Sequence, residues 1–141
     1  MQLSKHFTLS EFLISETADR LGIKNSLDLD YDAYIAYNLE NLCKWTLEPI
    51  RHKVGCAVHI SSGYRCPRLN EAVGGSSTSD HRYGLAADIY FDGFAEKWHE
   101  VVMLLVCNTC IPFDQLIVYR NFLHIGIGRA MRRQVLDYRD R

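Results

Sequence analysis

The spacing of apolar residues changes its period between residues 53 and 57, and this change limits the folds open to the chain. From 31 to 53, apolar side chains recur every three or four positions, as on one face of an α-helix. From 57 to 60 they alternate with polar ones, as in a half-buried strand. We therefore expect the longest helix at 31–53, with its last turn kinked or separate because Pro49 lies within it.

The remaining segments predict helices before this change and mainly strands after it. A capping-box pattern at Thr8–Glu11 begins the first short helix, and Gly22 ends the second. The expected elements are helices at 9–15 and 16–20, a loop at 61–79 with a short helix near 68–73, a strand at 86–91, a helix at 94–107, and strands at 115–119, 122–127 and 132–136. This order predicts an α+β fold with an antiparallel sheet.

Composition indicates a single domain over residues 1–141. The chain is 48% hydrophobic and 23% charged, which is ordinary for a globular protein. A formal net charge of -1 gives no reason to expect a nucleic-acid partner. The arginines of the last thirteen residues are most simply a solvated strand and tail. We expect a monomer.

No segment predicts a membrane span, because the longest apolar run, Val101–Cys107, is far too short. No apolar run follows Met1, so we expect synthesis in the cytoplasm without a signal peptide. Work outside the cell would then need another route, such as release of the phage type.

The cysteines do not predict a disulfide framework. There are five of them, an odd number, and no secretory signal accompanies them. Cys107 and Cys110 form a C-x-x-C at the end of an apolar helical run, without a second cysteine pair. We expect them to be buried or half-buried structural thiols.

Two histidines and one aspartate stand out by their surroundings. Asp88 lies inside an apolar stretch, where a lone carboxylate is costly unless it is paired or bound to a metal. Small residues, among them Gly84, allow a tight backbone that brings His81 back toward Asp88. Period-two alternation places His124 on the same side of its strand as Gly126, which leaves space beside the imidazole.

Two imidazoles and one carboxylate leave a fourth position for water, which is the pattern of a catalytic zinc site. The alternative is that Asp88 pairs with an arginine and that His124 is an ordinary histidine on an edge strand. Spacing alone slightly favours this alternative, so the metal site needs the support of longer motifs.

Such motifs are present. Residues 79–88 match serine-x-histidine-x-x-glycine-x-alanine-x-aspartate at every specified position. Residues 62–70 read Ser-Gly-Tyr-Arg-Cys-Pro-Arg-Leu-Asn, 113–117 read Phe-Asp-Gln-Leu-Ile, and 123–125 read Leu-His-Ile. Together they resemble the zinc D-alanyl-D-alanine carboxypeptidases and L-alanyl-D-glutamate endopeptidases, peptidoglycan peptidases that share the fold of the hedgehog signalling domain.

Residues 7–12 and 47–51 also look similar to the compact, phage-associated branch of this family, so the resemblance covers nearly the whole chain. It implies an antiparallel sheet that carries the zinc site and packs against N-terminal helices and one later helix. It also implies functional residues, which are zinc ligands at His81, Asp88 and His124, a substrate-binding Arg65 facing the cleft, and Ser79 near the ligand loop or the substrate.

Alternatives remain open for two of these residues. A planar guanidinium binds a carboxylate with two hydrogen bonds, which suits Arg65 to a substrate carboxylate. A structural salt bridge would also explain it. Ser79 fits a simple turn-forming serine as well as it fits a residue beside the substrate.

The chain departs from the family pattern beside the last histidine. A base is commonly an acidic residue about three positions before this ligand, or a histidine slightly further back, but here the residues are Asn121 and Tyr119. An amide takes no proton at neutral pH, and a tyrosine with a pKa of about 10 is a poor base. Tyr119 can still hydrogen-bond a developing oxyanion or the zinc-bound water. The carboxylates that might act as a displaced base are Glu71, Asp80, Asp92 and Asp114.

Two functions follow as hypotheses. Zinc lowers the pKa of bound water from about 15.7 to about 7, on the order of 12 kcal/mol, whereas a positioned general base adds about 10²–10⁴-fold. A zinc peptidase that cuts a peptidoglycan stem peptide, as a carboxypeptidase or an endolysin-like endopeptidase, is therefore possible without the usual base. The second hypothesis is a weak or silent zinc domain that binds muropeptide or a protein partner. A third, a structural domain without metal, predicts no bound zinc.

Overall fold

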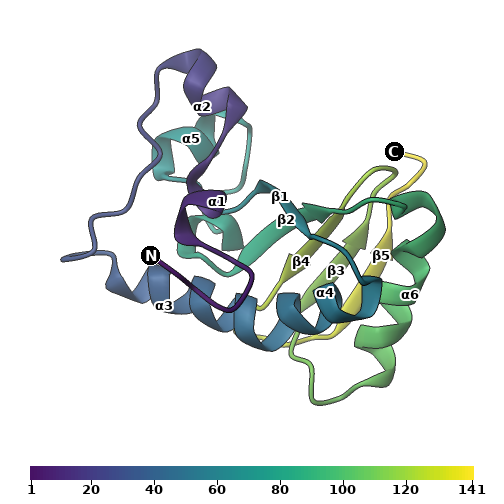
Figure 1. The fold of residues 1–141 in the computed structure, drawn as a ribbon. Coiled ribbons are helices and arrows are strands. Elements are labelled where there is room, and N and C mark those ends of the chain that lie inside the picture. The colour runs from purple at the N-terminus through teal and green to yellow at the C-terminus, as the bar shows by residue number, and fades with distance from the viewer.

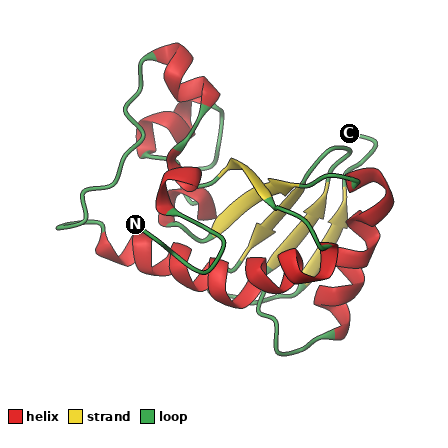
Figure 2. Cartoon of the chain, in the orientation of Figure 1, coloured by secondary structure: helices red, strands yellow, loops and turns green.

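The computed structural model describes all 141 residues, and it contains a five-stranded sheet with helices packed beside it (Figures 1 and 2). This agrees with the α+β class expected from the order of the patterns. The helices are α1 (Leu9–Leu13), α2 (Glu16–Leu21), α3 (Ala33–Leu42), η1 (Cys43–Leu47), α4 (Glu48–Val54), α5 (Pro67–Ala72), η2 (Asp80–Tyr83) and α6 (Phe94–Cys107). The strands are β1 (His59–Ser62), β2 (Ala86–Tyr90), β3 (Gln115–Val118), β4 (Leu123–Gly126) and β5 (Gln134–Asp137).

The sheet has the strand order β1-β2-β4-β3-β5 and is antiparallel except at its last pair. The expectation of an antiparallel sheet is wrong for β5, which runs parallel to β3. After β4 the chain crosses the end of β3 and turns back beside it. Alternation of apolar residues fixes which face a side chain occupies, but it says nothing about the direction of the partner strand.

Arginines of the C-terminal segment hold this crossover in place. The Arg133 guanidinium donates to the main-chain carbonyls of Leu105, Asn108 and Ile111, and it lies 4.5 Å from the centre of the Phe113 ring. The interpretation of these C-terminal arginines as merely solvated is therefore wrong for Arg133. Its partners are too distant in the chain for a local pattern to reveal them.

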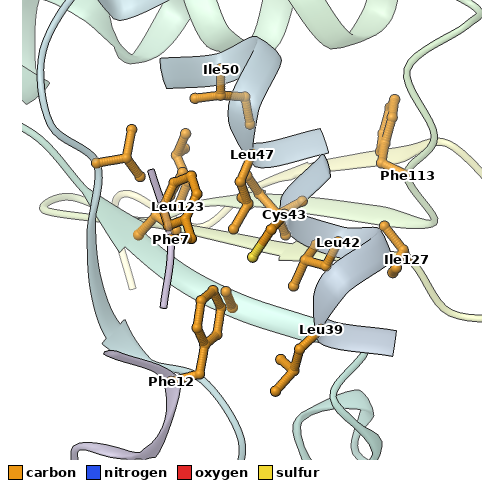
Figure 3. Packing of buried hydrophobic residues seen from close by; sticks show 14 of the residues in the cluster. Phe7, Phe12, Leu39, Leu42, Cys43, Leu47, Ile50, Phe113, Leu123 and Ile127 are labelled. Atoms are coloured by element: carbon orange, nitrogen blue, oxygen red, sulfur yellow. The ribbon is translucent and has the colours of Figure 1, made fainter. Parts of the chain in front are cut away.

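One face of the sheet packs against the helices. Figure 3 shows Leu39, Leu42 and Leu47 of the long helical segment in one buried cluster with Leu123 of β4 and with Phe12. The α4 helix also packs against α6 on this side (Figure 1). The core therefore lies between the sheet and the helices, and the opposite face of the sheet is left for polar side chains.

The predicted helix at 31–53 is one helical segment in three parts. The backbone widens to a π-helical turn over Cys43–Leu47, where the Glu48 amide donates to the Cys43 carbonyl. Pro49 has no amide hydrogen for the Trp45 carbonyl, and its ring would crowd that oxygen in a regular α-helix. The wider turn separates them, so the irregularity precedes Pro49 instead of following it.

The cysteine prediction is also wrong in part, because Cys107 and Cys110 are both exposed. The α6 helix buries Val101 and Leu105 and turns its other side outward, and the chain then leaves the core. None of the helices has the length and apolarity to cross a bilayer.

Candidate metal site and cleft

His81 is fixed by a short 3-10 helix, η2, between two polar anchors. The Ser79 hydroxyl caps this helix by accepting from the His81 amide at 3.3 Å. Gly84 ends it with a φ of +70°, and a Cβ there would lie 2.6 Å from the Ile35 carbonyl of α3. The Gly63 carbonyl accepts from His81 Nδ1 at 2.7 Å, so Nε2 is the nitrogen free to face the cleft.

Asp88 and His124 are direct cross-strand partners on β2 and β4. His124 Nδ1 lies 2.9 Å and His81 Nε2 3.4 Å from the same atom, Asp88 Oδ1. Burial by itself would raise the pKa of the Asp88 carboxyl, but hydrogen bonds from His124 and His81 outweigh burial and hold the pKa well below its usual range. Asp88 is therefore an anion at neutral pH, buried between two imidazoles.

The three side chains fit a metal ion of the size and preference of zinc. Their donor atoms all lie within 4.8 Å of one another. In a tetrahedral site with ligand distances of about 2.1 Å, donor atoms are about 3.4 Å apart. A small adjustment of these separations would therefore admit the ion, with Nε2 of His81, Nδ1 of His124 and one oxygen of Asp88 around it.

Arg65 lies at the rim of this group. Its guanidinium donates to the Ser62 hydroxyl at 3.3 Å and to the Asn70 amide oxygen at 3.4 Å, and its Nη2 atom lies 3.9 Å from Asp88 Oδ2. The main-chain amide of Arg65 also donates to the His81 carbonyl. The distance to Asp88 is long for an ion pair. The hydrogen bonds to Ser62 and Asn70 therefore position the Arg65 side chain, while some of its guanidinium N–H groups stay free.

A cleft of about 920 Å³ lies over the polar face of the sheet. The cleft is lined by all six residues to which the sequence assigned a metal-binding, substrate-binding or catalytic role, which are Arg65, Ser79, His81, Asp88, Tyr119 and His124. Asn121 is exposed and does not line this cleft. The residue at the position of the usual acid therefore does not face the candidate metal site in this chain.

Tyr119 does line the cleft, but as a protonated phenol. Its ring stacks on Phe122 with centroids 4.5 Å apart and is edge-on to Tyr138. Burial raises its pKa, and the negative charge of Asp88 raises it further. The hydroxyl is thus a hydrogen-bond donor at neutral pH and is unsuited to accept a proton.

The sequence offered four carboxylates that might act as a displaced base, and the position of each relative to the cleft distinguishes them. Glu71 and Asp92 do not line it. Asp114 does, but its carboxylate accepts hydrogen bonds from the main-chain amide, Nε and Nη2 of Arg132 at 2.8, 2.9 and 3.0 Å, so it has a structural role. Asp80 lines the cleft without a hydrogen bond to its carboxylate, and its pKa is raised by burial and by the charge of Asp114.

A cleft with two imidazoles and a carboxylate converging at its floor defines a candidate site of the kind that zinc hydrolases use. Residues 5–126 match the family described as Peptidase M15, which is most of the chain. The chain therefore belongs to the peptidase M15 family of hydrolases, metallopeptidases that typically depend on zinc. No curated protein matched the sequence significantly.

Proposed function

We propose that this chain is a zinc metallopeptidase that hydrolyses a peptide bond in the stem peptide of peptidoglycan, as a carboxypeptidase or an endopeptidase, with an endolysin-like role. The observation that carries the proposal is the convergence of His81, Asp88 and His124 beside Arg65 in one open cleft. We also propose a single domain over 1–141 with the hedgehog/DD-peptidase-like fold, of the compact, phage-associated branch.

Each residue has a role in this proposal. His81, Asp88 and His124 hold the metal, which when bound supplies an activated water and polarises the scissile carbonyl. Arg65 binds a substrate carboxylate or carbonyl with its free donors, which orients the peptide in the cleft. Its position 3.9 Å from Asp88 keeps that anchor close to the reacting bond.

Tyr119 and Ser79 have supporting roles. The raised pKa of Tyr119 keeps its hydroxyl protonated, so it can donate a hydrogen bond to the oxygen on which negative charge develops. Ser79 caps the turn that carries His81, which favours the turn-forming role over direct binding of substrate.

The test is hydrolysis of purified peptidoglycan, with released fragments identified by mass spectrometry. The full chain is incubated with zinc or with a chelator, alongside His124→Ala and the matched control His99→Ala, whose imidazole is exposed on α6. We expect zinc-dependent product from the wild type and the control only. Absence of product at every zinc concentration would count against the enzyme.

A second candidate function is a zinc domain that binds muropeptide or a protein partner without turnover. It is favoured by Asn121, which supplies no base and is exposed outside the cleft. Asn121→Glu distinguishes the two functions. Under the peptidase proposal it changes the rate less than about twofold because the new carboxylate stays outside the cleft, whereas hydrolysis that appears only in this variant would identify a domain silenced by one substitution.

A further inference from the structure

Asp80 is the acidic side chain of the cleft that no protein group engages. It begins the η2 helix directly before His81, is half buried, and lines the same cleft as His81 and His124. Its carboxylate accepts no hydrogen bond, whereas the neighbouring Asp114 accepts three from Arg132. A half-buried anion without a partner is costly, so a hydrogen-bond donor near Asp80 is expected.

The carboxylate of Asp80 and Nε2 of His124 both border the space left by the missing side chain of Gly126. A Cβ built on Gly126 would lie 3.1 Å from Asp80 Oδ2 and 3.8 Å from His124 Nε2. A Cβ on Gly128 would lie 2.8 Å from the same oxygen. The two glycines therefore leave free space at the Asp80 carboxylate, and the space beside Gly126 also borders His124 Nε2.

The tautomer of the His124 imidazole determines what an acceptor near Nε2 would do. His124 turns Nδ1 toward Asp88 and His81, so Nδ1 is the nitrogen that would bind a metal. A neutral imidazole has one donor and one acceptor nitrogen, so binding through Nδ1 requires the proton to be on Nε2. His124 Nε2 has no protein acceptor at hydrogen-bond distance, and the Asp80 carboxylate borders the same space beside Gly126.

We propose that Asp80 is a positioning residue for the metal site, whose carboxylate accepts a hydrogen bond from the Nε2–H of His124, directly or through one water, and so keeps Nδ1 turned toward the metal. Histidine ligands are commonly oriented in this way by a carboxylate behind them. The arrangement complements His81, whose outward nitrogen already donates to the Gly63 carbonyl. The inference rests on the proposed zinc site.

The test is the zinc affinity of the full chain, measured by competition with a chromogenic chelator. Loss of an orienting partner typically weakens metal binding 10- to 100-fold, and we expect this range for Asp80→Ala. Asp80→Asn keeps an acceptor oxygen and should recover part of the affinity. Asp92→Ala removes the same charge from an exposed position outside the cleft and should bind zinc like the wild type.

A second readout separates orientation from the simple attraction of a negative charge. In the zinc-loaded wild type, the Nε2 proton of His124 should give a downfield, slowly exchanging NMR signal, which Asp80→Ala should lose. Gly126→Ala should displace the Asp80 carboxylate from the space beside residue 126, because the new Cβ would be 3.1 Å from its oxygen. Gly126→Ala should weaken zinc binding when Asp80 is present. It should have no additional effect in the Asp80→Ala background.

The outcomes distinguish this inference from the proposed function. Zinc affinity within twofold of the wild type in Asp80→Ala, or persistence of the His124 Nε2 signal there, would overturn the positioning role while leaving the metal site intact. A wild-type protein that binds no zinc would overturn the metal site, and the positioning role with it.

Discussion

Zinc should stabilise the fold, and the stabilisation should depend on the donors of the candidate site. Binding to the folded chain at 100 times the dissociation constant contributes about 2.7 kcal/mol. Unfolding entropy is about 2.1 cal/mol/K per residue, which for 141 residues gives about 0.3 kcal/mol per degree. The midpoint of thermal unfolding should therefore rise by about 9 °C when zinc replaces a chelator.

Replacement of single histidines locates this effect. His81→Ala or His124→Ala should remove most of the shift, whereas His99→Ala should keep it. Each variant is compared with and without zinc by calorimetry, so a change in its metal-free stability cancels. The five free cysteines can bind zinc in the unfolded chain, which lowers the shift equally in all variants. An equal shift in His124→Ala and His99→Ala would refute the assignment of the site.

Three further predictions concern arginines and the acid that one of them binds. Arg65→Ala should lower kcat/KM for peptidoglycan fragments about 10- to 100-fold, because charge-assisted hydrogen bonds are lost, with zinc content unchanged; equal kinetics would exclude Arg65 from substrate binding. Arg133→Ala should lower the free energy of unfolding in urea by about 2–4 kcal/mol, because three carbonyls lose a charged donor, and Arg133→Lys should recover only a fraction. The hydrogen bonds from Arg132 hold the pKa of Asp114 below 3.8, so this pair stabilises the fold above about pH 4 and less as the pH falls. Asp114→Asn should therefore reduce the dependence of the free energy of unfolding on pH below about pH 4, and an unchanged dependence would contradict the prediction.

The sequence predicted side-chain faces better than it predicted partners. Alternation at 122–127 placed His124 opposite the core, and the structure has Leu123 and Ile125 buried there. The direct pairing of Asp88 with His124 depends on strand register across 36 residues, which alternation does not specify.

The role that we propose for Asp80 could not be predicted from the sequence, for a similar reason. Four carboxylates were equivalent as displaced acids, and only the packed structure shows that Asp114 is taken by Arg132 while Glu71 and Asp92 lie outside the cleft. The parallel pairing of β5 was missed because it depends on distant contacts. In each case the deciding interaction joins residues far apart in the chain, where local patterns carry no information.

The pairing of Asp88 with His124 across two adjacent strands also has a consequence for how such a chain can change length. An insertion in the surface loops around α6 leaves the two residues opposite each other, since strand register fixes their separation. A single residue inserted within β2 or β4 would turn every later side chain of that strand to the other face and carry one donor into the core. Natural variation in length should therefore collect in the loops on either side of α6, while β2, β3 and β4 keep their residue count.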